Sequence, residues 1–146
     1  MTIQRILAAL DSSPRAAAVC SQAAELAVHY RAELVLFQSV GIPPEMPPEV
    51  WSTPDVQLLD LLEKRARENL AEHAATLPAS LQGKYRLRVD VAAPWSGICS
   101  AAEQEHAQLI VIGSHGYGGL DRLLGTTAAK VVNHARCSVL VVRPEL

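Results

Sequence analysis

Residues 109–119 read LIVIGSHGYGG, a fully apolar run of strand length that passes directly into a loop with four glycines in seven residues. An unbroken apolar strand is typical of a parallel sheet whose two faces are both covered by helices. Such sheets bind ligands beyond the carboxyl ends of their strands, where two loops diverge. This stretch therefore predicts an α/β fold with a binding loop directly after Ile112.

Strand and helix patterns alternate along the rest of the chain. The expected strands are residues 3–10, 34–40, 85–91, 109–112 and 138–142, and the expected helices are residues 14–30, 54–77, 95–106 and 127–135. Ser13-Pro14 and Thr53-Pro54 each place a capping residue before a proline, which is a common way for a helix to begin. The regular alternation predicts one parallel sheet with right-handed crossovers.

Two segments depart from this pattern. Residues 85–91 alternate apolar and charged side chains, which indicates a strand covered on one face only, so we place it at the edge of the sheet. Residues 41–54 carry five prolines and no periodicity, which predicts a long exposed loop containing Trp51. This loop is either a lid over a bound ligand or a surface for a partner, and the sequence does not choose between them.

Composition narrows the class of protein. The chain has 146 residues, 49% of them hydrophobic, which is the size of one domain with an ordinary core. A net charge of -2, without a basic block, argues against a nucleic-acid partner. No apolar run approaches the roughly 20 residues of a membrane span, and no targeting leader is recognisable. The three well-separated cysteines are interpreted as reduced thiols, so we expect a cytoplasmic protein.

The glycine loop has the features of an anion site. Gly125, Thr126 and Thr127 precede an apolar helix, so free amides and two hydroxyls meet at a helix N-terminus. A flexible turn is the alternative interpretation of the glycines. The two standard phosphate motifs are absent, because Gly119 stands where a P-loop has its lysine and Asp121 stands where a dinucleotide fingerprint has its third glycine.

Several segments together resemble the universal stress protein family. They are Asp11-Ser12-Ser13, residues 107–113, Gly113-Ser114-His115-Gly116, Leu123-Leu124-Gly125-Thr126, residues 131–135 and residues 138–142. The resemblance covers essentially the whole chain and implies an adenine nucleotide alpha hydrolase-like fold. The predicted architecture is thus one domain, residues 1–146, with an open parallel five-stranded sheet of order 3-2-1-4-5 and helices on both faces.

The resemblance also implies which residues bind ATP. The backbones of the three motif glycines, with two threonines, would hold the phosphates, Ile112 would line the sugar or base side, Ser39 would contact adenine through its main chain, and Asp11 would lie near the base and ribose or a phosphate-bound Mg2+. The residues expected to hold the phosphates are Gly113, Gly116, Gly125, Thr126 and Thr127. Only eight residues separate Gly116 from Gly125, one fewer than in typical ATP-binding members.

Individual residues keep alternative interpretations. Asp11 can simply cap the following helix, with Ser12 or Ser13 sharing that task. His115 can donate to a phosphate or lie free in solvent, and Arg122 can pair with phosphate or with a surface carboxylate. The sequence shows no local catalytic triad and no pair of histidines at metal-ligand spacing, so we assign no catalytic residue and no side-chain metal cluster.

The sequence leaves three functions open. The first is a stress-response or regulatory protein that binds ATP and hydrolyses it slowly at most, because the loop lacks a lysine and an evident base. The second is an interaction module of the same fold that binds no nucleotide. The third is a nucleotide-handling enzyme such as a nucleotidyl transferase or flavoprotein subunit, for which 146 residues leave little room. The resemblance further implies a homodimer formed through Ser138–Val142.

Overall fold

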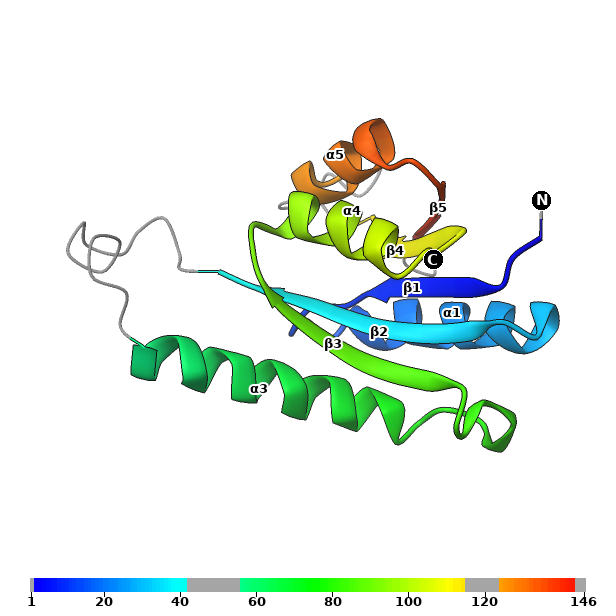
Figure 1. The fold of residues 1–146 in the computed structure, drawn as a ribbon, viewed down its shortest axis with the longest axis horizontal. Helices are drawn as coiled ribbons and strands as arrows, with labels where there is room; N and C mark the ends of the chain where they lie inside the picture. The colour runs from blue at the N-terminus through cyan, green and yellow to red at the C-terminus, as the bar shows by residue number, and fades with distance from the viewer. Residues whose placement is uncertain (1, 42–55, 115–123, 144–146) are drawn as a thin grey trace.

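The structure is a computed structural model that describes residues 2–41, 56–114 and 124–143 (Figure 1). Its elements in chain order are β1 (Arg5–Ala9), α1 (Ala16–Tyr30), β2 (Glu33–Val40), α3 (Val56–Ala74), the 3-10 helix η1 (Ala79–Leu81), β3 (Tyr85–Val91), α4 (Pro94–Gln104), β4 (Leu109–Gly113), α5 (Thr126–His134) and β5 (Ser138–Val142). The expected order of strands and helices is confirmed, and η1 is an addition within the described residues.

All five strands belong to one parallel sheet of order β3-β2-β1-β4-β5. This confirms the predicted sheet order and the edge position of the alternating strand. Ile6 in the central strand β1 pairs with Leu34 of β2 and with Leu109 of β4. Because every pair is parallel, the carboxyl ends of all the strands lie at the same edge of the sheet.

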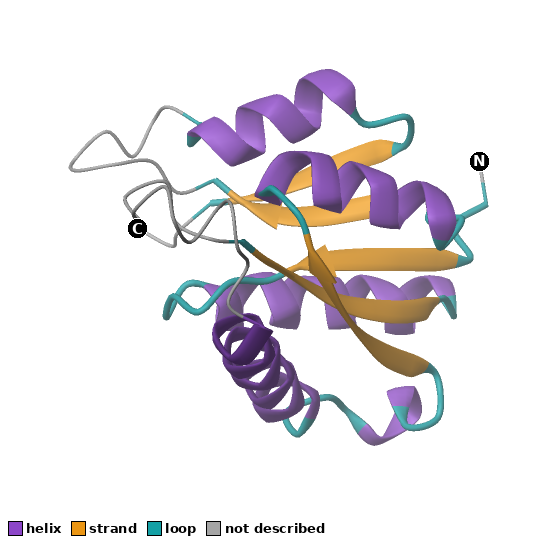
Figure 2. Cartoon of the chain, turned by 60° about the vertical axis from the view of Figure 1, so that its left-hand side comes forward, coloured by secondary structure: helices purple, strands orange, loops and turns teal. Residues whose placement is uncertain are grey.

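Helices cover both faces of the sheet, as Figures 1 and 2 show. Alternate side chains of β1 divide between two cores, since successive strand residues point to opposite faces. Ile6 and Ala8 are fully buried in the core beneath α1 and α3, whereas Leu7 is fully buried in the core beneath α4 and α5. The apolar strands therefore form the middle layer of a three-layer molecule.

The first helix begins later than Ser13-Pro14 predicts. α1 starts at Ala16, its N-cap residue is Arg15, and no side chain caps it. The hydroxyl of Ser13 donates instead to Asp11, while its backbone carbonyl accepts a hydrogen bond of 3.1 Å from the amide of Ala16. Ser13 thus belongs to the preceding turn. The second cap-and-proline pair, Thr53-Pro54, lies outside the described residues, as does the loop over residues 42–54.

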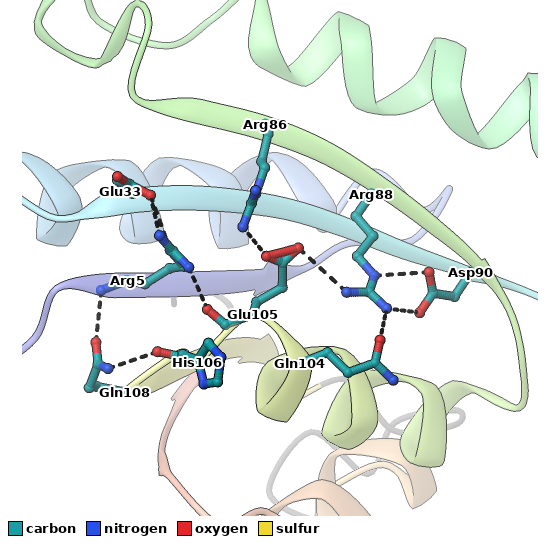
Figure 3. A network of polar contacts seen from close by, with 9 residues as sticks. All are labelled: Arg5, Glu33, Arg86, Arg88, Asp90, Gln104, Glu105, His106 and Gln108. Carbon is teal, nitrogen blue, oxygen red and sulfur yellow. Dashed lines mark hydrogen bonds and ion pairs between the residues drawn. The ribbon is translucent and has the colours of Figure 1, made fainter.

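The polar face of β3 is partly covered, because Arg86 is exposed whereas Arg88 and Asp90 are half-buried. The prediction of a single covered face is therefore correct for Arg86 and incomplete for the other two residues. Arg86 and Arg88 both form ion pairs with Glu105, which follows α4 and is only 8% exposed. Arg88 also forms an ion pair of 2.9 Å with Asp90, and its proximity raises the pKa of the Arg88 guanidinium. Figure 3 shows these side chains meeting between β3 and the end of α4.

The same network continues to the central strand. The guanidinium of Arg5 donates to the backbone carbonyl of Glu105 at 2.7 Å and forms an ion pair with Glu33 (Figure 3). The amide oxygen of Gln108 accepts a hydrogen bond of 2.8 Å from the backbone of Arg5. The end of α4 is therefore fixed to β1, β2 and β3 by polar contacts as well as by its apolar face.

Candidate functional site

The turn after β1 is organised by Asp11. Its carboxylate oxygen Oδ1 accepts a hydrogen bond of 2.9 Å from the backbone amide of Ser13 and one of 2.7 Å from the Ser13 hydroxyl. A short acidic side chain that binds the backbone two residues later forms an Asx turn. The alternative interpretation of Asp11 as a cap of the following helix is therefore wrong, because Asp11 caps this turn and no side chain caps α1.

The start of α5 is a second polar element. Gly125 is the N-cap residue, no side chain caps the helix, and its first turn contains no acidic residue. The Gly125 amide donates to the carbonyl of Ser114 at 3.2 Å, which holds the helix start beside the end of β4. Thr126 and Thr127 occupy the first turn, where backbone amides have no partner within the helix. This end of α5 thus carries partial positive charge.

These two elements border one cavity of about 270 Å³ at the carboxyl edge of the sheet. Seven of the eight predicted binding residues line it, namely Asp11, Ser39, Ile112, Gly113, Gly125, Thr126 and Thr127. The eighth, Gly116, lies outside the described residues, as do His115 and Arg122. Four separate segments of the chain are thus brought together where the sequence predicted a crevice.

Gly113 has a packing role that the sequence did not suggest. A Cβ atom at this position would lie 3.3 Å from Cγ2 of Val19 in α1. The absent side chain therefore lets α1 approach the end of β4, in addition to leaving the backbone accessible from the cavity. Ile112, only 5% exposed, packs in the core beneath α4 and α5.

A polar network behind the cavity was missed by the sequence analysis. Gln38 is 8% exposed and lines the cavity, and its amide nitrogen donates to the Ser12 hydroxyl at 3.2 Å. Asn69 of α3 donates to the amide oxygen of Gln38 at 2.8 Å and to the backbone carbonyl of Asp11 at 2.9 Å. The ends of β1 and β2 are consequently joined through one side chain of α3.

Arg15 is a second residue that sequence reasoning missed. It is exposed, precedes α1 and lines the same cavity as Thr126. The sequence search for a phosphate partner considered Arg122, which is near the glycines in sequence. Arg15 lies far from them in sequence, and only the parallel arrangement of β1 and β4 brings the two turns together.

Ser114 is only 2% exposed, and its hydroxyl has no hydrogen-bond partner among the described residues. The described part of the chain contains no group of three His, Cys, Asp or Glu side chains that could hold a metal ion. It also contains no helix that is long and apolar enough to cross a membrane.

Comparison with known proteins identifies the family. The model of the universal stress protein family matches residues 2–143. The chain belongs to the universal stress protein family. Universal stress protein A homolog 1 of Coxiella burnetii is 34% identical over 143 residues, which are 97% of each chain.

Solved structures of universal stress proteins share the fold. The universal stress protein UspA from Lactobacillus plantarum has a TM-score of 0.82 and 26% identity, with 98% of this chain and 99% of that chain covered. The universal stress protein from Archaeoglobus fulgidus in complex with dAMP has a TM-score of 0.61 and 20% identity, with 98% and 100% covered. At this low identity the second comparison supports the fold alone.

Proposed function

We propose that this universal stress protein binds an adenine nucleotide, with ATP as the preferred ligand, in the cavity between the Asp11 turn and the start of α5. One observation carries the proposal: seven residues predicted from the family resemblance, which come from four separate segments of the sequence, line a single cavity. Its volume of about 270 Å³ is close to the lower end of the 300–1,000 Å³ range of small-molecule sites. The dAMP complex of a protein with the same fold is consistent with this ligand class.

Each part of the nucleotide has suitable partners in the proposed site. The uncapped amides of Thr126 and Thr127 can donate to phosphate oxygens, and Arg15 supplies a positive charge at the cavity. Ser39 is a half-buried residue of the cavity lining and would meet the adenine edge through its main chain, and Ile112 provides an apolar wall. The ligand is thus held mainly by backbone groups, as the predicted motif requires.

Mg2+ would enter with the phosphates. The cavity lining contains one carboxylate, that of Asp11, and one of its oxygens already accepts two hydrogen bonds from Ser13. Mg2+ commonly binds one or two carboxylates together with phosphate oxygens and water. Asp11 therefore fits as a single supporting ligand for a phosphate-bound ion, which neutralises phosphate charge when present.

We propose regulation by ligand binding, with slow ATP hydrolysis at most. Fast phosphoryl transfer requires a positioned nucleophile and dense positive charge around the γ-phosphate. Among the described cavity residues, Arg15 is the single cation and Asp11 the single carboxylate, and the latter is engaged by Ser13. These groups support binding of the nucleotide more than its hydrolysis. We further propose that the protein is cytoplasmic and consists of one domain.

The test is direct identification of bound nucleotide. The purified protein is denatured with acid, and the released ligand is identified by chromatography, while calorimetry measures ATP affinity with Mg2+. Removal of the Thr126 hydroxyl by Thr126→Ala should cost about 1.5–3 kcal/mol, or about a 10- to 150-fold loss of affinity, if it binds phosphate. Thr76→Ala, at the far end of α3, is the control and should bind as the parent does.

Absence of adenine nucleotide from the purified protein, together with no binding at millimolar ATP, would refute the proposal and favour the interaction module. Equal affinities of the parent and Thr126→Ala would show that the Thr126 hydroxyl does not bind phosphate. The proposal that the nucleotide binds in this cavity would then rest on the other lining residues.

We also propose a homodimer formed through β5. This strand is at one edge of the sheet, and its side chains from Val139 to Val142 are only half-buried in the single chain. An apolar edge strand is a template for pairing with another strand unless it is covered. A mass in solution of twice the 15.7 kDa chain, measured by light scattering, is the expected result. A monomer at all concentrations would contradict it.

A further inference from the structure

Two of the three cysteines line one cavity that is separate from the candidate nucleotide site. Cys99 lies in α4, and Cys137 lies in the connection between α5 and β5. Both thiols are free and half-buried, and both border a cavity of about 400 Å³. The polar groups of that cavity are those of Glu103, His106, Gln108 and Arg136.

An ion pair shows which face of α4 meets the connection. Arg136 forms an ion pair of 2.9 Å with Glu103, and both side chains are at least half exposed. Exposed pairs of this kind contribute little energy, but they define proximity. Glu103 lies four residues after Cys99, so the two share one side of the helix. Cys137 directly follows Arg136 and lines the same cavity as Cys99 and Glu103, so the two cysteines border that cavity from α4 and from the connection.

Apolar packing gives an independent indication of the same proximity. Cys99 and Cys137 both pack against the core beneath α4 and α5, which includes Ile98 and Ile110. Burial is the main cause that raises the pKa of the Cys137 thiol; a backbone hydrogen bond partly opposes it, and the nearby Cys99 and Glu103 add to it. Burial, and then Glu103, likewise raise the pKa of Cys99.

We propose that Cys99 and Cys137 are a redox pair that closes to an intramolecular disulfide when a small disulfide such as oxidised glutathione is in excess. The thiolate of one cysteine attacks the oxidised glutathione, forms a mixed disulfide and releases one glutathione thiolate. The second cysteine thiolate then attacks the protein sulfur of that mixed disulfide and releases the second glutathione thiolate. The two cysteines lose two electrons and two protons, and one oxidised glutathione becomes two reduced molecules.

The bond would join α4 covalently to the start of β5. At present the described contacts between these segments near the cavity are the exposed Arg136–Glu103 pair and side-chain packing. A disulfide would add a constraint on the connection from α5 to β5. This second site depends on neither ATP binding nor the proposed dimer.

Cys20 provides the matched control. It is also a free thiol, but it is 2% exposed and lies in the core beneath α1 and α3, on the opposite face of the sheet. Burial raises the pKa of its thiol as well. It thus shares the chemistry of the pair but does not line the cavity that Cys99 and Cys137 share.

The experiment equilibrates the full chain with glutathione buffers of increasing oxidised fraction, blocks the remaining thiols with an alkylating reagent, and maps the peptides by mass spectrometry. The parent should lose two of its three thiols together and yield a peptide pair linked through Cys99 and Cys137, with Cys20 alkylated. Cys20→Ser should form the same link. Cys99→Ser and Cys137→Ser should each stop at a mixed disulfide with glutathione.

The yield of the linked peptides should not depend on protein concentration, since the bond is intramolecular. Stable mixed disulfides on both cysteines of the parent would overturn the proposal, as would links between chains or no oxidation of the pair at all. Circular dichroism of each variant, with parent-like spectra required, ensures that the result concerns the thiols and not the fold.

Discussion

The side-chain amide of Asn69, in the middle of α3, donates a hydrogen bond of 2.9 Å to the backbone carbonyl of Asp11 at the end of β1. The same nitrogen donates to the amide oxygen of Gln38 in β2 at 2.8 Å. Two neighbouring strand ends that border the candidate cavity therefore depend on one donor from a helix that does not itself line the cavity.

Replacement of this donor should destabilise the protein. Asn69→Leu keeps a similar size but leaves the carbonyl of Asp11 and the amide oxygen of Gln38 without this partner, at a cost of about 1–3 kcal/mol for a buried polar group left unsatisfied. The free energy of unfolding in urea measures it. Glu68→Ala, at the exposed neighbouring position, is the control and should change stability by less than about 0.5 kcal/mol. Equal effects of the two substitutions would contradict the role of Asn69.

Arg15 should distinguish nucleotides by their phosphates. If its guanidinium pairs with phosphate at the exposed mouth of the cavity, Arg15→Gln should weaken ATP binding by up to about 1 kcal/mol, or about fivefold. Binding of adenosine, which has no phosphate, should not change. Calorimetry at two salt concentrations checks both ligands, with Arg31→Gln, at the far end of α1, as the control variant. A parallel loss for ATP and adenosine would assign Arg15 to the fold or the base side instead.

The two carboxylates near the end of α4 should differ in their effect on stability. Glu105 is 8% exposed and is shared by Arg86 and Arg88. Glu105→Gln therefore removes the ion pair of Arg86 and leaves Arg88 with Asp90 as its charged partner. We expect a loss of about 1–3 kcal/mol in unfolding free energy. Glu103→Gln removes the exposed pair with Arg136 and should cost less than about 1 kcal/mol. Similar losses for the two variants would mean that burial does not decide the value of these pairs.

The thiols of Cys99 and Cys137 should react slowly at neutral pH and faster in base. Both pKa values are raised, first by burial, so the reactive thiolate is scarcer near pH 7 than in a free thiol. The rate of alkylation should rise about tenfold per pH unit until the pH passes the raised pKa. The titratable and charged side chains that line the same cavity are those of Glu103, His106 and Arg136. Peptide-resolved alkylation rates check this, and a rate that is already independent of pH at neutrality would contradict it.

The sequence predicted the sheet because its strands are nearly unbroken apolar runs, and it placed β3 correctly because Arg86, Arg88 and Asp90 interrupt that strand alone. The positions around the candidate cavity followed from the family motif. The sequence did not predict which polar side chains would form hydrogen bonds with one another. Nothing about Asn69 in the sequence distinguishes it from its solvated neighbours, and its two acceptors become adjacent only when β1, β2 and α3 have packed.

The start of α1 and the covering of β3 were predicted incorrectly for a related reason. Ser13 before Pro14 has the residue types of a helix cap, but its hydroxyl is taken by Asp11 two residues earlier, so the helix begins at Ala16. The charges of β3 predicted an open face because the sequence does not show that α4 ends over that strand. The crossover from β3 to β4 brings Glu105 to both arginines, and no local pattern records that placement.

The link from Asn69 to Asp11 and Gln38 also connects the outer layer of the fold to the wall of the cavity. The backbones of β1 and β2 are spaced by their own parallel pairing, and the Asn69 amide additionally holds the Gln38 side chain, which lines the cavity. A substitution at position 69 would therefore release that side chain without replacing any residue that lines the cavity. The wall of the candidate site can thus be altered from a helix that does not border it.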